Sequence, residues 1–408
     1  MSDRDDDLLR MSKDEHIEAA HYAFKPVMNR ERNPLRKLSE VVRHINKDRP
    51  EGDHVAPDTV GRAIHRALKD EAVAVEPRKR RFRALPPRRE KMETKLVNLY
   101  GLDDAIVLEC PESKIAGDPD AYSTLQMKLG YAFAEEIAKS WKHMFPRTKP
   151  RSFGLGGGRA TRSLAARLQT LHPPELWPEQ TIYSLAGSLF DNVCWIDDQP
   201  VLLDADSVAG NFSTCFADER DLRRVRHPLV IDENIREASL RATRLREFGK
   251  DGQHTVAILG AGLGTLQSHF ENDFEKERGI CQPIQEPLRE LLTWAKRLDD
   301  RYGESAGWSP LGSLTNDWFY VPPHESLGLK HEQLDGLEEK LEAVRSHLMC
   351  ATMDEIGKAA DQVCLLGGGA GKAGVIDYLA DRRFKGKVSV IVTSTGTAQR
   401  IFKWHGIN

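Results

Sequence analysis

The apolar positions of the chain follow two different spacings. Between residues 33 and 69 they recur every three or four positions, which predicts amphipathic helices. From about residue 92 onward, short continuous apolar runs alternate with helical segments, and such runs are typical of strands buried on both faces of a parallel sheet. The runs predict strands at 105–108, 152–155, 181–185, 228–231, 255–259, 362–366 and 388–392. We therefore expect a doubly wound, mainly parallel α/β domain, with less regular segments at 186–225 and 265–330.

The N-terminal part predicts two helices, a strand and a basic segment. The first helix starts at Asn33-Pro34, a pair that suits a capped helix start, and its apolar stripe ends at Ile45. The second helix runs from Pro57, and its outward side is short, polar and cationic: Thr59, Arg62, His65, Arg66 and Lys69. A strand at 72–75 then precedes a segment that contains Arg78, Lys79, Arg80, Arg81 and Arg83. This order predicts a winged helix-turn-helix, although a plain helical hairpin with a charged linker has the same pattern.

Charge is distributed unevenly along the 408 residues. The whole chain has a formal net charge of −3, but residues 25–95 carry 20 basic and 11 acidic side chains, and the first 24 residues carry 3 basic and 7 acidic ones. A basic segment in an otherwise acidic chain is expected where one part of a protein contacts a polyanion. The outward side of the second helix would then contact bases and phosphates of duplex DNA, and the basic segment would follow the sugar-phosphate backbone.

Three predicted strands end in glycine-rich turns that lead into helices, with the sequences FGLGGGRATRSL, VAILGAGLG and LLGGGAGKAGV. Turns that follow parallel strands meet at one edge of the sheet, where glycines allow a ligand to approach the backbone. Each turn alone is more typical of a tight strand-to-helix connection. Arg159 and Lys372, however, both stand where a helix begins, and a cation there opposes the helix dipole unless an anion binds beside it. Together the two cations favour an anion-binding site.

Seven blocks of the chain, in the correct order, resemble the SorC family of sugar-binding transcriptional regulators, whose effector domain is shared with DeoR-like repressors. The blocks are PDTVGRAIHRALKDEAVAVE, LVNLYGLDDAIVLE, FGLGGGRATRSLAARL, HPLVIDENIREASL, TVAILGAGLG, MDEIGKAADQVCLLGGGAGKAGVIDYL and VSVIVTSTGTAQRIF. The resemblance implies a DNA-binding winged helix-turn-helix with its basic linker in residues 1–90. It implies a sugar-binding effector and oligomerisation domain in residues 91–408, similar in fold to sugar-phosphate isomerases, and a homodimer or homotetramer.

The resemblance also implies a sugar or sugar-phosphate effector that controls the affinity for operator DNA. With the glycine-rich turns, it indicates these ligand-binding residues: Gly154, Gly156, Gly158, Arg159, Thr161, Gly260, Gly262, Asp317, Gly368, Gly369 and Lys372. The chain departs from the family where the usual loop threonine falls on Ala160 and where Ser394-Thr395 replaces an acidic pair. The departures leave open which sugar binds and whether it is phosphorylated, and the sequence leaves open whether the protein represses or activates transcription.

Signals for other chemistry are weak. The six cysteines are scattered without a C-x-x-C pair, as expected of reduced thiols in the cytoplasm, and the 14 histidines show no metal-ligand spacing. No apolar run reaches the length of a membrane span. We therefore expect a cytoplasmic regulator without cofactor or metal, and not an enzyme. A sugar-phosphate isomerase-like enzyme with the same α/β domain remains the alternative, because fold alone does not determine function.

Overall fold

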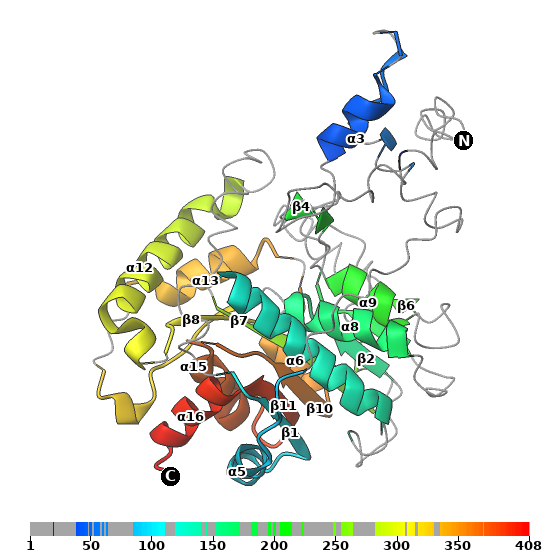
Figure 1. The fold of residues 1–408 in the computed structure, drawn as a ribbon. Helices are drawn as coiled ribbons and strands as arrows, with labels where there is room; N and C mark the ends of the chain where they lie inside the picture. Colours follow the sequence, from blue (N-terminus) through cyan, green and yellow to red (C-terminus); the bar gives the residue numbers. More distant parts are fainter. Residues whose placement is uncertain are drawn as a thin grey trace. The chain divides into compact units, whose positions relative to one another are not determined.

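A computed structural model describes most of the C-terminal three quarters of the chain and parts of the N-terminal quarter. The described residues are 19, 38–47, 49–50, 53–57, 59–60, 63, 85–110, 119–139, 144, 152–171, 181–186, 195–196, 199–200, 205–213, 222–223, 248–249, 254–263, 282–306, 308–314, 317–329, 335–348, 350–369 and 371–407. The chain divides into two compact units (Figure 1). One consists of Met1–Ala84 with Cys194–Val201, and the other of Leu85–Val193 with Leu202–Asn408.

The N-terminal unit contains the helix α3 (Leu38–Ile45) and a small apolar cluster. Val41 and Ile45 of α3 belong to this cluster together with Val55, Val60 and Ala63. The Asn46 side chain connects the segments, because its amide donates to the Val55 carbonyl at 3.0 Å and its oxygen accepts from the Val55 N–H at 2.8 Å. The first predicted helix is therefore confirmed over 38–45. The same unit holds the antiparallel pair β4 (Trp195–Ile196) and β5 (Gln199–Pro200).

One sequence prediction in this unit is wrong. Thr59 was expected on the exposed side of the second helix, but its side chain is buried, at 3% exposure. The reason is helical spacing, because residues four positions apart share a face, and Ala63 is fully buried. Residues 57, 59, 60 and 63 are helical, as predicted for the second helix, while its other positions after 57, the strand at 72–75 and the basic segment at 78–83 lie outside the described residues.

The second unit is organised around a mainly parallel sheet with the strand order β1-β11-β10-β7-β2-β3-β6. The strands are β1 (Asp104–Leu108), β2 (Ser152–Leu155), β3 (Thr181–Ser184), β6 (Leu222–Arg223), β7 (Thr255–Leu263), β10 (Gln362–Leu366) and β11 (Val388–Ser394). Every neighbouring pair along this path is parallel. The end of β7 continues beyond the parallel region and pairs antiparallel with β8 (Leu311–Leu314), which pairs with β9 (Asp317–Tyr320).

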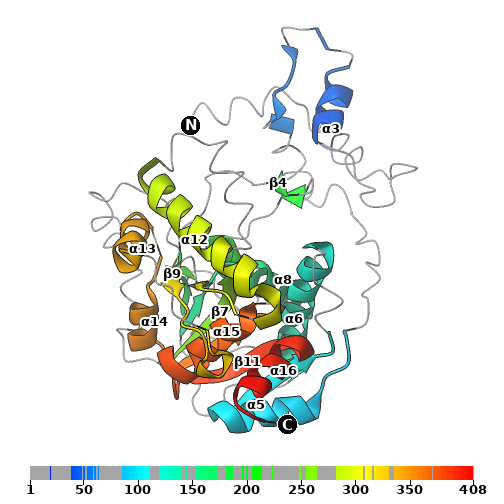
Figure 2. The same cartoon turned by 90° about the vertical axis from the view of Figure 1, so that its left-hand side faces the viewer.

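Successive residues of the central strands alternate between two hydrophobic cores, one on each face of the sheet. Val363 and Leu365 of β10 belong to one core, and Cys364 and Leu366 belong to the other. The first core is covered by α5 (Glu90–Tyr100), α12 (Gln282–Ala306), α13 (Leu337–Arg345), α14 (Met353–Ala359), α15 (Lys372–Asp377) and α16 (Thr395–Trp404). The second is covered by α6 (Pro119–Lys139), α8 (Arg159–Leu171) and α9 (Ala205–Ser213) (Figures 1 and 2). The predicted doubly wound α/β architecture is confirmed for this unit.

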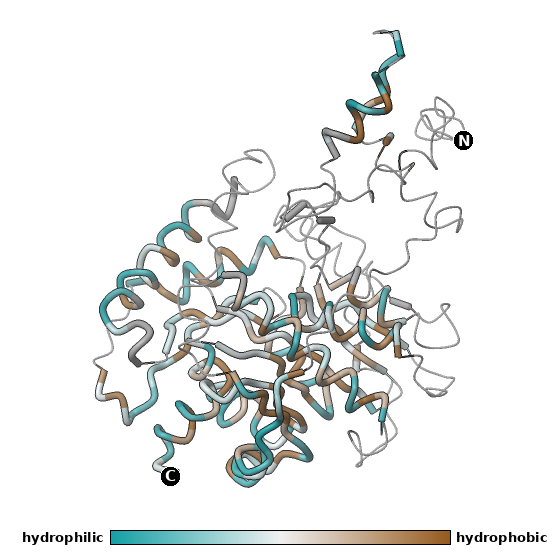
Figure 3. Tube along the Cα trace, in the orientation of Figure 1, coloured by the Kyte–Doolittle hydropathy of each residue, from teal (hydrophilic) through white to brown (hydrophobic). Residues whose placement is uncertain are grey.

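The hydropathy of the second unit follows these layers. The helices α5 and α12 carry many hydrophilic positions on their outer sides (Figure 3), whereas every residue of β10 and β11 is buried. None of the described helices is both long and apolar enough to cross a membrane. Six of the seven predicted strands are confirmed, and the prediction at 228–231 lies outside the described residues. The hairpin of β8 and β9 was not predicted.

Candidate functional site

The glycine-rich turns of the second unit follow β2, β7 and β10, whose carboxyl ends lie at one edge of the parallel sheet. Two of the turns lead directly into α8 and α15, while β7 continues into the hairpin with β8. The turns lie close together in space. A Cβ added to Gly260 of β7 would lie 3.2 Å from the Gly157 carbonyl oxygen, and one added to Gly367 would lie 3.1 Å from Ala261 Cβ. The absence of side chains allows these three backbone segments to approach one another.

Helix α6 contacts two of these turns with a single face. The face consists of Tyr122, Gln126, Leu129 and Gly130. Residues three or four positions apart share a face of a helix, and Gln126 is four positions from Tyr122 and Gly130 and three from Leu129. Gln126 Nε2 donates to the Gly368 carbonyl at 2.6 Å, in the turn after β10. Gly130 packs against the first turn of α8, where an added Cβ would collide with the Ala160 carbonyl oxygen. Helix α6 therefore fixes the turn after β2 relative to the turn after β10.

Lys372 is the most unusual residue at this edge. Its side chain is buried, at 4% exposure, at the first position of α15. Its Nζ donates to Gln126 Oε1 at 3.2 Å and lies 5.3 Å from the centroid of the Tyr122 ring. No carboxylate of the described residues forms an ion pair with it. Burying an ammonium group without an opposite charge is costly, and an amide and a ring face compensate for only part of the lost hydration.

The residues around Lys372 offer further polar groups. The N–H of Gly369 donates to Thr397 Oγ1 at 3.0 Å, and Thr397 Oγ1 lies 3.0 Å from Ser394 Oγ. Gly369 and Gly371 have φ angles of 109° and 78°, which residues with a side chain rarely adopt. The glycines allow this turn conformation, and the Thr397 hydroxyl, itself in contact with Ser394, stabilises it through a hydrogen bond. Ser394-Thr395, the positions of the expected acidic pair, are neutral.

The turn after β2 places a second cation at the start of a helix. Gly158 has a φ of 119°, and its carbonyl accepts a hydrogen bond from Thr161 Oγ1 at 3.0 Å. Arg159 is half-buried, and no described residue forms a hydrogen bond or ion pair with it. Thr161, predicted as a ligand-binding residue, is 1% exposed and uses its hydroxyl inside the turn.

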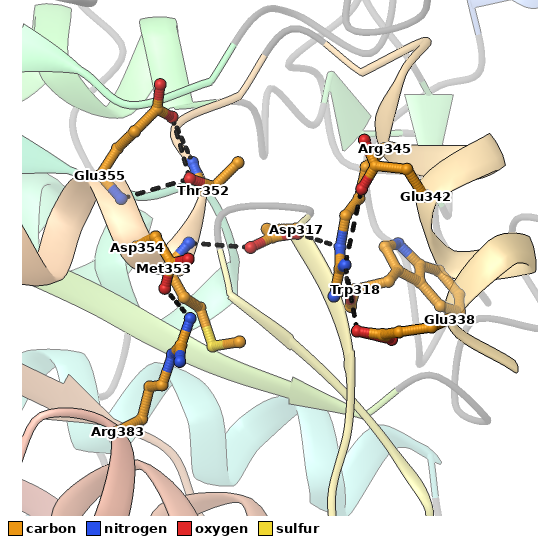
Figure 4. Close-up of polar contacts among 10 residues, drawn as sticks. All are labelled: Asp317, Trp318, Glu338, Glu342, Arg345, Thr352, Met353, Asp354, Glu355 and Arg383. Atoms are coloured by element: carbon orange, nitrogen blue, oxygen red, sulfur yellow. Dashed lines mark hydrogen bonds and ion pairs between the residues drawn. The ribbon is translucent and has the colours of Figure 1, made fainter.

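Three predicted ligand-binding residues have partners within the protein. A Cβ on Gly154 would lie 2.5 Å from Phe248 Cζ, and one on Gly262 would collide with Ser313 Oγ, so both glycines allow close packing of neighbouring segments. Asp317 is 2% exposed and uses both carboxylate oxygens: Oδ1 lies 3.1 Å from Arg345 Nε, and Oδ2 accepts from the Met353 N–H at 2.8 Å (Figure 4).

The Arg345 guanidinium connects several parts of this network. It also donates to the Trp318 carbonyl, through Nε at 3.0 Å and Nη2 at 2.8 Å (Figure 4). Met353 begins α14, whose N-terminus is closed by a capping box between Thr352 and Glu355. Asp317 therefore joins β9 to α13 and α14, and burial raises its pKa while the Arg345 charge opposes this rise.

The structure adds residues that the sequence did not indicate. Tyr122 and Gln126 lie in the first half of a long helix, without glycine or charge at those positions, and only their contacts with Lys372 identify them. Of the predicted DNA contacts, Thr59 is buried. The other predicted DNA contacts lie outside the described residues: Arg62, His65, Arg66, Lys69, Arg78, Lys79, Arg80, Arg81 and Arg83.

Comparison with known proteins finds similarity in fold. No protein-family model and no curated protein sequence matches the chain. A transcriptional regulator from Streptococcus pneumoniae TIGR4 has a similar structure, with 12% identity, a TM-score of 0.50, and coverage of 78% of this chain and 97% of the other. The full-length sorbitol operon regulator SorC from Klebsiella pneumoniae has 14% identity and a TM-score of 0.47 over 95% of this chain and 97% of its own.

A DeoR family transcriptional regulator from Listeria monocytogenes has 16% identity and a TM-score of 0.45, over 76% of this chain and 98% of its own. Regulators of the DeoR and SorC families are thus among the solved structures that resemble this chain, as the sequence blocks indicated. At these identities the similarity concerns the fold.

Proposed function

We propose that this protein is a DNA-binding transcriptional regulator of the SorC type, and that a sugar or sugar-phosphate effector controls its affinity for operator DNA. In this proposal the basic N-terminal part, residues 1–90, binds duplex DNA, and residues 91–408 bind the effector and form a homodimer or homotetramer. The effector lies at the carboxyl edge of the sheet, beside the turns after β2 and β10. The regulator has no catalytic role.

The observation that carries the proposal is the buried side chain of Lys372. Its charge has no carboxylate partner among the described residues, and its hydrogen-bond partner, Gln126, is neutral. A bound phosphate or carboxylate would supply the missing charge and an acceptor of short, charge-assisted hydrogen bonds. Arg159 is a second available cation in the neighbouring turn. Two cations, an amide and several hydroxyl groups favour an anionic, polyhydroxylated ligand.

The same residues argue against the enzymatic alternative. Isomerisation of a sugar phosphate requires a general base close to the carbon that loses its proton. Asp317, the acidic candidate from the sequence, has both oxygens bound to Arg345 and Met353. Ser394 and Thr397, beside the Gly368–Gly369 turn, are neutral at physiological pH. A site of this composition suits binding better than proton transfer.

The effector site can be tested with Lys372→Met in the full-length protein. We expect a sugar phosphate to raise the melting temperature of the wild type, because a ligand at one hundred times its Kd stabilises by about 2.7 kcal/mol. The variant should lose this shift, while its own melting temperature without ligand stays equal or rises, since an uncompensated buried charge has been removed. The measurement is a thermal-shift series with aldose and ketose phosphates, the unphosphorylated sugars and inorganic phosphate.

The matched control is Lys385→Met. This control makes the same substitution at an exposed lysine. The Lys385 side chain is 75% exposed, and its Nζ pairs with Asp381 at 3.3 Å. This variant should respond to the ligand as the wild type does. If Lys372→Met melts well below the wild type without ligand, the lysine has a structural role. If it keeps the full ligand shift, the effector site lies elsewhere.

A further inference from the structure

Two histidines and an aspartate meet at the opposite ends of the two helices that contribute to the candidate effector site. Asp377 is the last residue of α15, and His405 follows the end of α16. His324 is the N-cap of the short helix η6 (Glu325–Leu327). One ligand atom from each of the three side chains lies within 4.8 Å of the other two. The residues are separated by many positions in sequence, so their meeting depends on the fold.

The carboxylate of Asp377 has more acceptor capacity than the structure uses. Its Oδ1 accepts from the Tyr100 hydroxyl at 2.6 Å and lies 2.8 Å from His405 Nε2, whereas Oδ2 has no hydrogen-bond partner among the described residues. The side chain is 11% exposed, and no described lysine or arginine pairs with it. With neutral imidazoles the cluster carries one nearly buried negative charge.

Both imidazole rings are oriented by their surroundings. The His324 ring stacks on Trp404 at 5.8 Å with an interplanar angle of 14°, and it meets the His405 ring at 5.0 Å. His324 Nδ1 accepts a hydrogen bond from the Ser326 N–H at 3.2 Å and lies 2.8 Å from Ser326 Oγ, so Nε2 is the nitrogen left for a metal ion. The Tyr100 ring contacts His405 edge-on at 6.1 Å. Secondary contacts of this kind are what orient the ligands of metal sites, because a metal-binding imidazole is usually fixed through its other nitrogen and by packing.

We propose that His324, Asp377 and His405 bind a divalent transition-metal ion of the zinc type. Two imidazole nitrogens and a carboxylate oxygen suit zinc and its neighbours in the first transition row, whereas magnesium and calcium prefer oxygen ligands. Ligand atoms placed tetrahedrally around zinc lie about 3.4 Å apart. Side-chain rotations that move the ligand atoms by about an ångström would therefore bring them to this spacing. Binding replaces the hydrogen bond between His405 and Asp377, and the neutral His405 ring then carries its proton on Nδ1 instead of Nε2. A water molecule or an external group completes the coordination.

Such an ion would connect three elements of the second unit, at the C-terminal ends of two helices that begin beside the glycine-rich turns. It would join α15, α16 and η6, and α16 also packs beside α5, which carries Tyr100 (Figure 2). Helices α15 and α16 start at Lys372 and Thr395, in the candidate effector site. The ion therefore fixes the C-terminal ends of α15 and α16 relative to each other. This site is independent of the proposed effector and of DNA.

Metal titration of the full-length protein, stripped with chelator, tests the site. We expect one equivalent of Co²⁺ to bind and to give the visible d–d absorption of a site with imidazole ligands, and Zn²⁺ to displace it. Zn²⁺ should raise the melting temperature, and a chelator should reverse the rise. Affinity should fall as the pH is lowered, because bound imidazole must be deprotonated. Binding of less than one equivalent of either metal ion overturns the proposal.

Three variants locate the bound ion. Asp377→Asn keeps acceptors for Tyr100 and His405 but removes the charge, and His324→Phe keeps a ring over Trp404 but removes the ligand nitrogen. Each should weaken binding by at least about tenfold, because loss of mere supporting contacts already costs that much. His254→Ala is the matched control, since His254 also faces an aspartate, with Nδ1 3.8 Å from Asp361 Oδ2. If both cluster variants bind Co²⁺ as the wild type does, the ion lies elsewhere and the proposal fails.

Discussion

Two buried charged residues of the second unit differ in what surrounds them. Asp317 has a guanidinium and a backbone N–H as partners, one for each carboxylate oxygen. Lys372 has only an amide oxygen and a ring face. The resemblance to the SorC family made Asp317 a ligand-binding candidate, whereas Lys372 became one because it follows a glycine-rich turn at the start of a helix. The difference arises from residues 28 to 246 positions away. It gives Asp317 a structural role and leaves Lys372 as the proposed effector-binding residue.

The ion pair of Asp317 predicts a pH-dependent loss of stability in Arg345→Met. Burial raises the folded-state pKa of Asp317 above its unfolded value, so ionisation of this carboxyl opposes folding, and its favourable contribution is present at low pH and lost as the pH rises through the folded-state pKa. Removing Arg345 takes away the charge that limits the rise. We expect a loss of about 3 kcal/mol near neutral pH, as for a broken buried ion pair.

Urea unfolding at neutral pH and at a pH near the unfolded-state pKa of aspartate, about 3.9, measures this effect. The deficit of the variant should be smaller at the lower pH, where half of the unfolded-state and more than half of the folded-state Asp317 carboxyl is protonated. Glu342→Gln is the control, because Glu342 is 71% exposed and its carboxylate lies 3.8 Å from Arg345, so the change should stay within about 0.5 kcal/mol. An equal deficit at both pH values would contradict the assignment.

At the scale of elements, strands were predictable where they are apolar throughout. The runs at β10 and β11 are buried on both faces and mostly apolar, so both were found; the bounds of β10 were predicted, whereas β11 extends two residues beyond the predicted 392, through Thr393 and Ser394. The hairpin of β8 and β9 escaped prediction because its strands have four residues each and contain glycine, serine and aspartate. The glycine-rich turns were predictable for a similar reason, since they require backbone conformations or approaches that side chains exclude.

The helical contribution to the site was not predictable from local patterns. Helix α6 has 21 residues, and nothing in its composition distinguishes Tyr122 and Gln126 from other positions on its surface. Their role depends on how α6 crosses α8, and this crossing depends on Gly130. A contact between two helices is a property of the assembled layers, which a single sequence encodes only through the volumes of its side chains.

The crossing of α6 and α8 predicts a strong effect of Gly130→Ala. The added Cβ would collide with the Ala160 backbone oxygen, which cannot move without displacing the start of α8. We expect destabilisation of about 1–3 kcal/mol, as for overpacking in a core, in spite of the higher helix propensity of alanine. Thermal or urea unfolding measures it. Because α8 begins in the candidate effector site, ligand affinity should also fall.

Gly357→Ala separates steric collision from helix propensity. Gly357 also lies within a helix, α14, but its added Cβ would only touch Phe384 Cε1 at 3.4 Å, an ordinary contact distance. This variant should be neutral or stabilised by up to about 1 kcal/mol. Equal behaviour of the two variants would show that the helix crossing tolerates a methyl group, and that it does not set the position of the α8 turn.

At the scale of the whole molecule, the proposed function predicts reciprocal coupling between effector and DNA. If an effector changes the affinity for an operator by a certain factor, the operator changes the affinity for the effector by the same factor. Several cationic contacts with phosphates also predict a steep salt dependence, with log K falling by about 0.9 per phosphate contact for each unit of log salt concentration. Binding of fluorescent operator duplexes, selected from genomic fragments, measures both quantities across salt and effector concentrations.

Lys372→Met provides the control at this scale. It should retain the salt dependence of DNA binding, since residue 372 lies in the C-terminal unit, but lose the response to effector. Failure of the wild type to bind any duplex at low salt would contradict the proposed function. A salt-dependent interaction that no effector alters in the wild type would instead leave a DNA-binding protein without the proposed sensing.

The strand order has a consequence for how the protein is made. Strand β11 is inserted between β10 and β1, and it is the only strand that pairs with β1 in the described sheet. Arg88 adds an isolated antiparallel bridge to Leu108. Nearly 300 residues separate β1 from β11, so most of the chain is translated before β1 can pair with its partner strand. Until then β1 and β10 both present open hydrogen-bonding edges, which invite pairing with other chains. Chain termination before residue 388 leaves β1 and β10 without β11 between them, so truncated chains should be prone to pair with one another.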